Sequence, residues 1–132
     1  MTSRLPAWQE KFREKKRQHA DFFTPLRGVF VLRDSEWPVQ FSVVDVQLLK
    51  PDELARLRTL ADARELIFTD LRLLSLHPDS VEPFPGSTLR EYTDEHGQTH
   101  DNWQGGTLEV LEWSDPGKLS RQRTGTAVLR RP

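Results

Sequence analysis

Residues 28–49, GVFVLRDSEWPVQFSVVDVQLL, predict two β-strands joined by a polar turn. Branched and aromatic side chains, which favour strands, fill both arms, and the residues between them are typical of a turn. Within residues 39–49 the apolar side chains change face midway: one face takes Val39, Phe41 and Val43, and the other takes Val44, Val46 and Leu48. This change fits either a β-bulge near Val43 or a strand covered on both faces.

The sequence after this pair predicts one short helix and then mostly strands. Pro51 suits the first turn of a helix over residues 51–62, where two acids follow it. Residues 64–76 are the most apolar stretch and favour one or two buried strands, although a helix over 70–76 fits as well. Further strands are expected from period-2 alternation and flanking turns, over residues 88–93, 99–103, 107–113 and 124–129.

The N-terminal residues 6–23 predict an amphipathic helix, because one stripe of about 100° collects its apolar side chains. The stripe contains Leu5, Trp8, Phe12, His19, Phe22 and Phe23. The expected fold class is therefore α+β. We expect a mainly antiparallel sheet of five to seven strands, the N-terminal amphipathic helix and one further short helix.

A chain of 132 residues predicts a single domain spanning residues 1–132. Residues 1–5 are expected to be flexible, and residues 118–132 form a basic C-terminal segment. Residues 77–87 contain three prolines and are expected to form a loop. This loop is longer than most connections, which makes it a candidate functional loop or a domain-swap hinge.

Composition excludes several classes of function. The chain has no cysteine, so disulfides, thiol nucleophiles and thiolate metal sites are excluded. It has no apolar leader typical of secretion and no apolar run long enough for a membrane span, so we expect a soluble, cytoplasmic protein that does not bind membranes. A pI near 6.4 and a net charge of -1 do not favour bulk attraction to nucleic acid. No sequence motif indicates a catalytic residue or a cofactor, and none is expected.

Charge is segregated along the chain. Residues 1–20 carry six bases and two acids, and the last fifteen residues carry five bases and no acid. Between residues 77 and 117, nine acids stand against a single arginine. Because opposite charges must meet within the chain or at a partner, the first hypothesis is a non-catalytic protein–protein interaction protein of the adaptor, inhibitor or immunity type.

This hypothesis assigns partner binding to basic side chains near the termini and to aromatic anchors. Such a partner would be another protein or a second copy of the chain, which could form a homo-oligomer. The candidate residues are Trp8, Phe12, Lys15, Lys16, Trp103, Trp113, Arg121, Arg123, Arg130 and Arg131. The first alternative is a single-stranded nucleic-acid-binding domain that uses the same basic termini with exposed tryptophans, although the net charge disfavours it.

The second alternative is a metal-dependent hydrolase at the polar cluster of residues 94–101. If His96 and Gly97 form a hairpin turn, Thr93 pairs with His100, and Asp94 with Thr99. His96, His100 and Asp101 are then the weak candidates for metal ligands, because they do not converge clearly on one point. The competing interpretation is a solvated hairpin tip that binds no metal.

Overall fold

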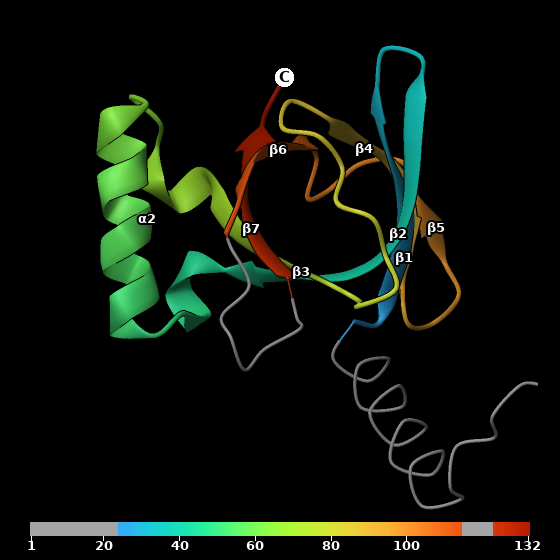
Figure 1. Cartoon of the computed structure of the whole chain (residues 1–132), viewed down its shortest axis with the longest axis horizontal. Coiled ribbons are helices and arrows are strands. Elements are labelled where there is room, and N and C mark those ends of the chain that lie inside the picture. Colours follow the sequence, from blue (N-terminus) through green and yellow to red (C-terminus); the bar gives the residue numbers. More distant parts are fainter. Residues whose placement is uncertain (1–23, 115–122) are drawn as a thin grey trace, which may run out of the picture.

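The computed structural model describes residues 24–114 and 123–132, and in these residues six antiparallel strands form a closed barrel (Figure 1). Around the barrel the order is β1-β2-β3-β7-β6-β4, and β4 pairs again with β1. The short β5 pairs with the end of β4. The strands are β1 (Leu26–Leu32), β2 (Ser35–Asp45), β3 (Leu71–Leu76), β4 (Thr88–Thr93), β5 (Thr99–His100), β6 (Thr107–Trp113) and β7 (Arg123–Arg130).

The expected α+β fold class is therefore wrong, because the sheet closes on itself instead of forming an open layer under helices. Closure comes from β1, which pairs with β2 on one edge and with β4 on the other. Gly28 permits this close approach, since a Cβ atom there would lie 2.7 Å from the Glu91 carbonyl oxygen. A closed ring leaves no unpaired strand edge in the barrel. The expected N-terminal helix of residues 6–23, like the expected flexibility of residues 1–5, lies outside the described residues.

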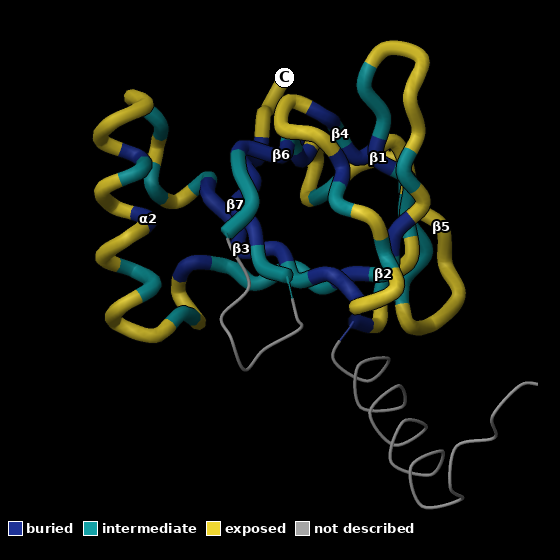
Figure 2. The backbone as a smooth tube through the Cα atoms, in the orientation of Figure 1, coloured by how far each residue is buried: buried dark blue, intermediate teal, exposed yellow. Residues whose placement is uncertain are grey.

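Helix α2 (Pro51–Ala63) packs on the outside of the barrel, against the face formed by β3, β6 and β7 (Figure 1). Two short 3-10 turns flank it, η1 (Val46–Leu48) and η2 (Phe68–Asp70). Leu57 and Ala61 are buried on the helix, whereas its outer side is exposed (Figure 2). Residues 71–76 form β3, which settles the earlier choice between strand and helix in favour of a strand.

Apolar residues on the two faces of residues 39–49 reach two different cores, although Leu48 is exposed. Val39 and Phe41 point into the barrel, where they belong to the interior cluster. The strand ends at Asp45, and the following turn places Val46 in the second cluster, under α2. The change of face therefore marks the transition from the barrel interior to the surface that the helix covers.

Arg72 lies in β3, where it pairs with Asp45 of β2 and Ala127 of β7, and its side chain is only 6 % exposed. Its Nη1 donates to the carbonyl oxygens of Thr69 and Leu71, and its Nη2 donates to Gln104 Oε1. The Nε atom lies 2.9 Å from Asp45 Oδ1, an ion-pair distance without hydrogen-bond alignment. Because a buried charge is costly unless it is paired, these contacts give Arg72 a structural role.

Candidate functional site

The long loop of residues 77–87 connects β3 to β4 (Figure 1). It is hydrogen-bonded to the barrel near its start. The His77 N–H donates to the Gln40 carbonyl oxygen at 2.8 Å. The Gln40 N–H in turn donates to Ser80 Oγ at 2.9 Å. The first residues of the loop therefore follow β2 closely.

The middle and the end of the loop are also fixed. Trp113 Nε1 donates to the Pro83 carbonyl oxygen at 2.7 Å, and Pro83 itself is fully buried. At the end of the loop, the Gly86 N–H donates to the Val110 carbonyl oxygen, and the Val110 N–H donates to that of Ser87. The loop is thus held by the barrel at three points, although it has no regular secondary structure.

This fixed loop presents two large apolar side chains to solvent. Phe84 is 63 % exposed and Val81 is 66 % exposed. The Phe84 ring lies against Trp37, with 5.2 Å between ring centroids and a tilt of 48°. We refer to Val81, Phe84 and the partly buried Trp37 as the loop patch.

Three acidic residues lie in or next to the segments that form the loop patch. Asp79 lies two residues before Val81, its side chain is 71 % exposed, and its Oδ2 lies 3.8 Å from His77 Nδ1. Glu36 precedes Trp37 and pairs with Arg90 at 2.7 Å, and Glu82 pairs with Arg123 at 3.4 Å. Two of these three carboxylates are therefore already paired with arginines.

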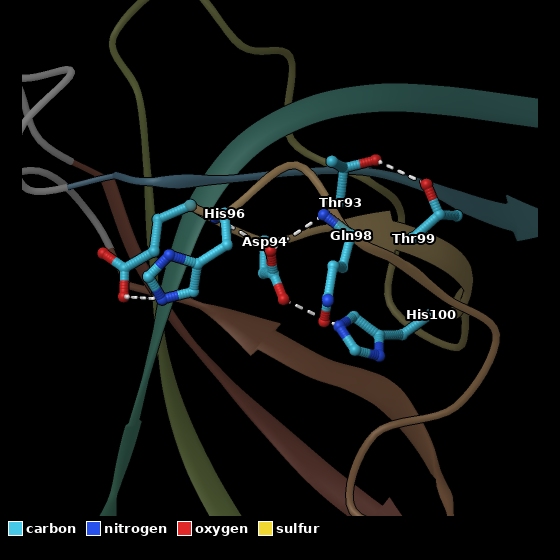
Figure 3. A network of polar contacts seen from close by, with 7 residues as sticks. Thr93, Asp94, His96, Gln98, Thr99 and His100 are labelled. Atoms are coloured by element: carbon cyan, nitrogen blue, oxygen red, sulfur yellow. Dashed lines mark hydrogen bonds and ion pairs between the residues drawn. The ribbon is translucent and has the colours of Figure 1, made fainter.

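The hairpin between β4 and β5 is organised by Asp94 (Figure 3). Its Oδ1 accepts hydrogen bonds from the N–H groups of His96 at 2.9 Å and Gln98 at 3.0 Å. Gly97 adopts φ +80°, a left-handed conformation that suits glycine, and its N–H donates to the Asp94 carbonyl oxygen. The carboxylate and the backbone carbonyl of Asp94 thus accept three N–H groups of the turn.

The expected pairing across this hairpin is wrong by one residue. Thr93 pairs with Thr99 and Tyr92 with His100, whereas the sequence predicted pairs of Thr93 with His100 and of Asp94 with Thr99. The longer turn capped by Asp94 accounts for the shift. The hydroxyl groups of Thr93 and Thr99 lie 3.1 Å apart and hydrogen-bond to each other.

His100 is held between a carboxylate and an aromatic ring. Its Nε2 lies 2.8 Å from Asp94 Oδ2, and its ring stacks on Tyr92 with 4.9 Å between centroids. Tyr92 also contacts Trp103 at 5.0 Å. The hydrogen bond from His100 is the largest cause that lowers the pKa of Asp94. Burial, and then the charge of Asp94, raise the pKa of Tyr92.

The candidate metal ligands of this hairpin are dispersed. His96 points away from His100 and lies 3.8 Å from the carboxylate of Glu95 (Figure 3). Asp101 Oδ1 accepts a hydrogen bond from the side chain of its neighbour Asn102. Among residues 24–114 and 123–132, no group of three or more His, Asp or Glu side chains could hold a metal ion.

The predicted partner-binding residues fall into three groups. Arg123, Arg130 and Arg131 each form an ion pair within the chain, with Glu82, Glu109 and Asp70 respectively. Trp103 and Trp113 are partly buried against the barrel core. The remaining five candidates lie outside the described residues: Trp8, Phe12, Lys15, Lys16 and Arg121.

The sequence analysis did not name any residue of the loop patch as a candidate site residue. The sequence did single out the proline-rich loop, but nothing local to Phe84 or Val81 predicts their exposure. That exposure depends on Trp37 and Trp113, which belong to other strands.

A groove of about 600 Å³ lies outside β1, between β2 and β4. Arg27 and Glu91 line it together with Thr93 and Thr99. These groups form no general acid–base pair or nucleophile arrangement, so the groove carries no candidate chemistry.

Comparison with protein-family models, with curated proteins and with solved structures gives no match for this chain. Of the helices in the described part of the chain, none has both the length and the apolar character needed to cross a membrane.

Proposed function

We propose that this chain is a non-catalytic interaction protein, of the adaptor, inhibitor or immunity type, that binds a protein partner through the loop patch. One observation carries the proposal: Phe84 is exposed, yet the loop that bears it is hydrogen-bonded to the barrel on both sides of it. Scattered surface hydrophobes are normal, but an exposed phenylalanine in contact with a tryptophan ring is a compact aromatic anchor.

A fixed loop lowers the entropic cost of binding, because its backbone is ordered before the partner arrives. Pro83 and Pro85 flank Phe84 and restrict its backbone further. Aromatic side chains in such positions often contribute a large share of the binding energy of an interface. These considerations favour a binding surface over a segment that merely connects two strands.

The surroundings of the patch suggest the chemistry of the partner. Asp79 places an exposed carboxylate two residues before Val81. The carboxylates of Glu36 and Glu82 are paired with arginines of the chain itself. A partner surface with an apolar centre and a lysine or arginine placed opposite Asp79 would complement this arrangement. The proposed binding takes place in the cytoplasm, with which a cysteine-free chain is compatible.

The test is a comparative capture experiment with three forms of the full chain. Wild-type protein, Phe84→Ser and Leu48→Ser are each used to capture proteins from native lysate. Leu48 is a matched control, because it is an apolar side chain that is 79 % exposed in η1, which follows β2. A partner retained by wild type and Leu48→Ser but lost with Phe84→Ser is then purified for titration.

Truncating a central aromatic anchor costs at least about 2 kcal/mol, so Phe84→Ser should weaken the purified complex roughly 30-fold. Equal affinity for Phe84→Ser and wild type would contradict the proposal. So would a partner that is lost only with Leu48→Ser.

A further inference from the structure

We infer that the loop patch binds a second copy of this chain, and that Phe84 of each copy enters the groove outside β1 of the other copy. This inference rests on the proposed function, since it names the partner of the same patch. Three observations carry it: the groove adjoins the patch, it has room for an aromatic ring, and the arginine that lines it complements Asp79.

The groove and the loop patch meet along β2. Pro38 lines the groove and directly follows Trp37, whose ring contacts Phe84 at 5.2 Å. Gln40 also lines the groove, and its backbone N–H donates to Ser80 Oγ of the loop at 2.9 Å. A projecting ring and a hollow that share one edge can serve two copies at once, because a twofold axis brings each ring opposite the hollow of the other copy.

The groove has the size and the apolar lining that the Phe84 ring requires. Its volume is about 600 Å³, whereas a cavity of about 150 Å³ already holds a benzene molecule. Val29 and Pro38 contribute apolar side chains to the lining, and they pair with each other across β1 and β2. Burial of the ring there removes apolar surface of both copies from water. The groove can therefore take Phe84 and leave space for Val81 beside it.

The charges at the groove favour one orientation of the contact. Arg27 and Glu91 both line the groove and are both exposed. Neither of them forms an ion pair within the part of the chain that the structure describes. The loop brings the exposed carboxylate of Asp79 close to its apolar residues. Because Asp79 is attracted by Arg27 and repelled by Glu91, the loop should enter the groove with Asp79 facing Arg27.

The first test is the mass of the full chain in solution, measured by sedimentation equilibrium at concentrations up to the millimolar range. One chain has a mass of 15.4 kDa, and wild type should approach the mass of two chains as concentration rises. Phe84→Ser should weaken the dimer at least about 30-fold, whereas Leu48→Ser should leave it unchanged. A wild-type chain that stays monomeric would overturn the inference. Growth beyond two chains would also overturn it, because open head-to-tail contacts produce such growth.

Charge reversal tests whether the groove is the surface that receives the loop. Asp79→Arg creates like charges in both contacts of the dimer, and so does Arg27→Asp. Each variant alone should dimerise at least about 10-fold more weakly than wild type. Lys50→Asp is the matched control and should dimerise like wild type. It reverses an exposed charge directly before α2, which packs on the opposite side of the barrel from β1 (Figure 1).

An equimolar mixture of Asp79→Arg and Arg27→Asp is the decisive sample. In a mixed dimer the two substituted positions face each other with opposite charges in one contact. The native Asp79 and Arg27 face each other in the second contact. The mixture should therefore dimerise with nearly wild-type affinity, although neither variant does so alone. An ion pair within one chain cannot produce this recovery. A mixture that associates no more tightly than its components would overturn the inference.

The inference and the proposed function fail separately in these experiments. A chain that stays monomeric but captures a different protein through Phe84 contradicts the inference alone. A dimer whose affinity is the same for Phe84→Ser and wild type contradicts the loop patch as its contact surface. If Phe84→Ser also captures the same proteins from lysate as wild type does, the proposed function fails as well.

Discussion

The proline-rich loop of residues 77–87 and the hairpin of residues 92–100 use their side chains in opposite ways. In the hairpin, Asp94, His100 and the backbone of the turn satisfy one another. In the loop, hydrogen bonds run to the barrel instead, and Phe84 and Val81 face solvent. The hairpin contains more residues capable of chemistry, but those groups are engaged in building the turn. The difference teaches how to choose a candidate binding site. Apolar side chains left exposed on a fixed backbone are a better guide than a high density of reactive side chains.

The largest effect should follow from removing Trp113, which fixes the loop to the barrel. Trp113→Ala deletes an aromatic ring packed on the core as well as the hydrogen bond to Pro83. We expect the free energy of unfolding to fall by about 3 kcal/mol, measured by urea denaturation. Trp113→Phe keeps most of the packing and should cost about 1 kcal/mol, the value of one hydrogen bond.

The Trp113→Phe variant also tests whether the hydrogen bond to Pro83 fixes the loop, which is the basis of the contrast between the loop and the hairpin. Amide hydrogen exchange at Glu82 and Phe84 should accelerate in Trp113→Phe, while exchange in the Asp94 hairpin stays unchanged. Unaltered exchange in the loop would mean that its conformation does not depend on the bond to Pro83.

A smaller effect is expected in the hairpin, and it should depend on pH. The hydrogen bond from His100 lowers the pKa of Asp94 below its ordinary value of 3.8. A carboxyl group with a lowered pKa in the folded state stabilises the fold above its unfolded pKa, and this stability is lost as pH falls through the folded pKa. Asp94→Asn should therefore destabilise the protein at neutral pH, by less than Trp113→Ala, and the difference from wild type should shrink below about pH 4.

Urea denaturation of wild type and Asp94→Asn at a series of pH values measures this difference. His100→Ala is the companion variant, because it removes the largest cause of the shift. In that variant the pKa of Asp94 should rise toward its ordinary value, as followed by carboxyl ¹³C chemical shift. A pKa that does not move would show that His100 leaves the Asp94 carboxylate unaffected in solution.

A smaller effect again concerns Tyr92, the only tyrosine of the chain. Burial first, and then the charge of Asp94, raise its pKa above 10.0. The unfolded chain should then ionise before the folded one as pH rises past 10, so stability should fall in that range. Ultraviolet absorbance of the phenolate should follow Tyr92 alone, and Asp94→Asn should move its pKa slightly downward. A titration at the ordinary value would exclude the partly buried position of the ring.

Local elements of this fold can be predicted from the sequence, but its closure cannot. The helix expected over residues 51–62 spans Pro51–Ala63. It could be predicted because Pro51 and the two acids after it favour a helix start through local effects in its first turn. The pairing of β1 with β4 joins segments about sixty residues apart, and period-2 alternation carries no information about which strands meet. The close contact at Gly28 that permits this pairing is visible only when both strands are in place.

The loop patch shows the same limit. Its prolines are visible in the sequence, but the exposure of Phe84 follows from Trp37 lying beneath it and Trp113 binding the loop. For the hairpin, the sequence located the turn near Gly97 but missed the strand register. The turn stabilised by the Asp94 carboxylate spans five residues, 94–98, rather than the four that were expected. In both segments, contacts between different elements determine the exposure and the register, which local sequence patterns do not specify.

The smallest effect on stability is expected at the patch itself. Phe84 is mostly exposed and Val81 even more so, so replacing either by serine removes little buried area. Phe84→Ser and Val81→Ser should change the free energy of unfolding by no more than about 0.5 kcal/mol, as surface substitutions usually do. Urea denaturation of the two variants beside Leu48→Ser provides the measurement. A cost well above that of Leu48→Ser would mean that Phe84 serves the fold, as Asp94 serves the hairpin. A small loss of stability would mean that the fold does not need the Phe84 ring. This is what we expect of a side chain that is kept at the surface to bind a partner.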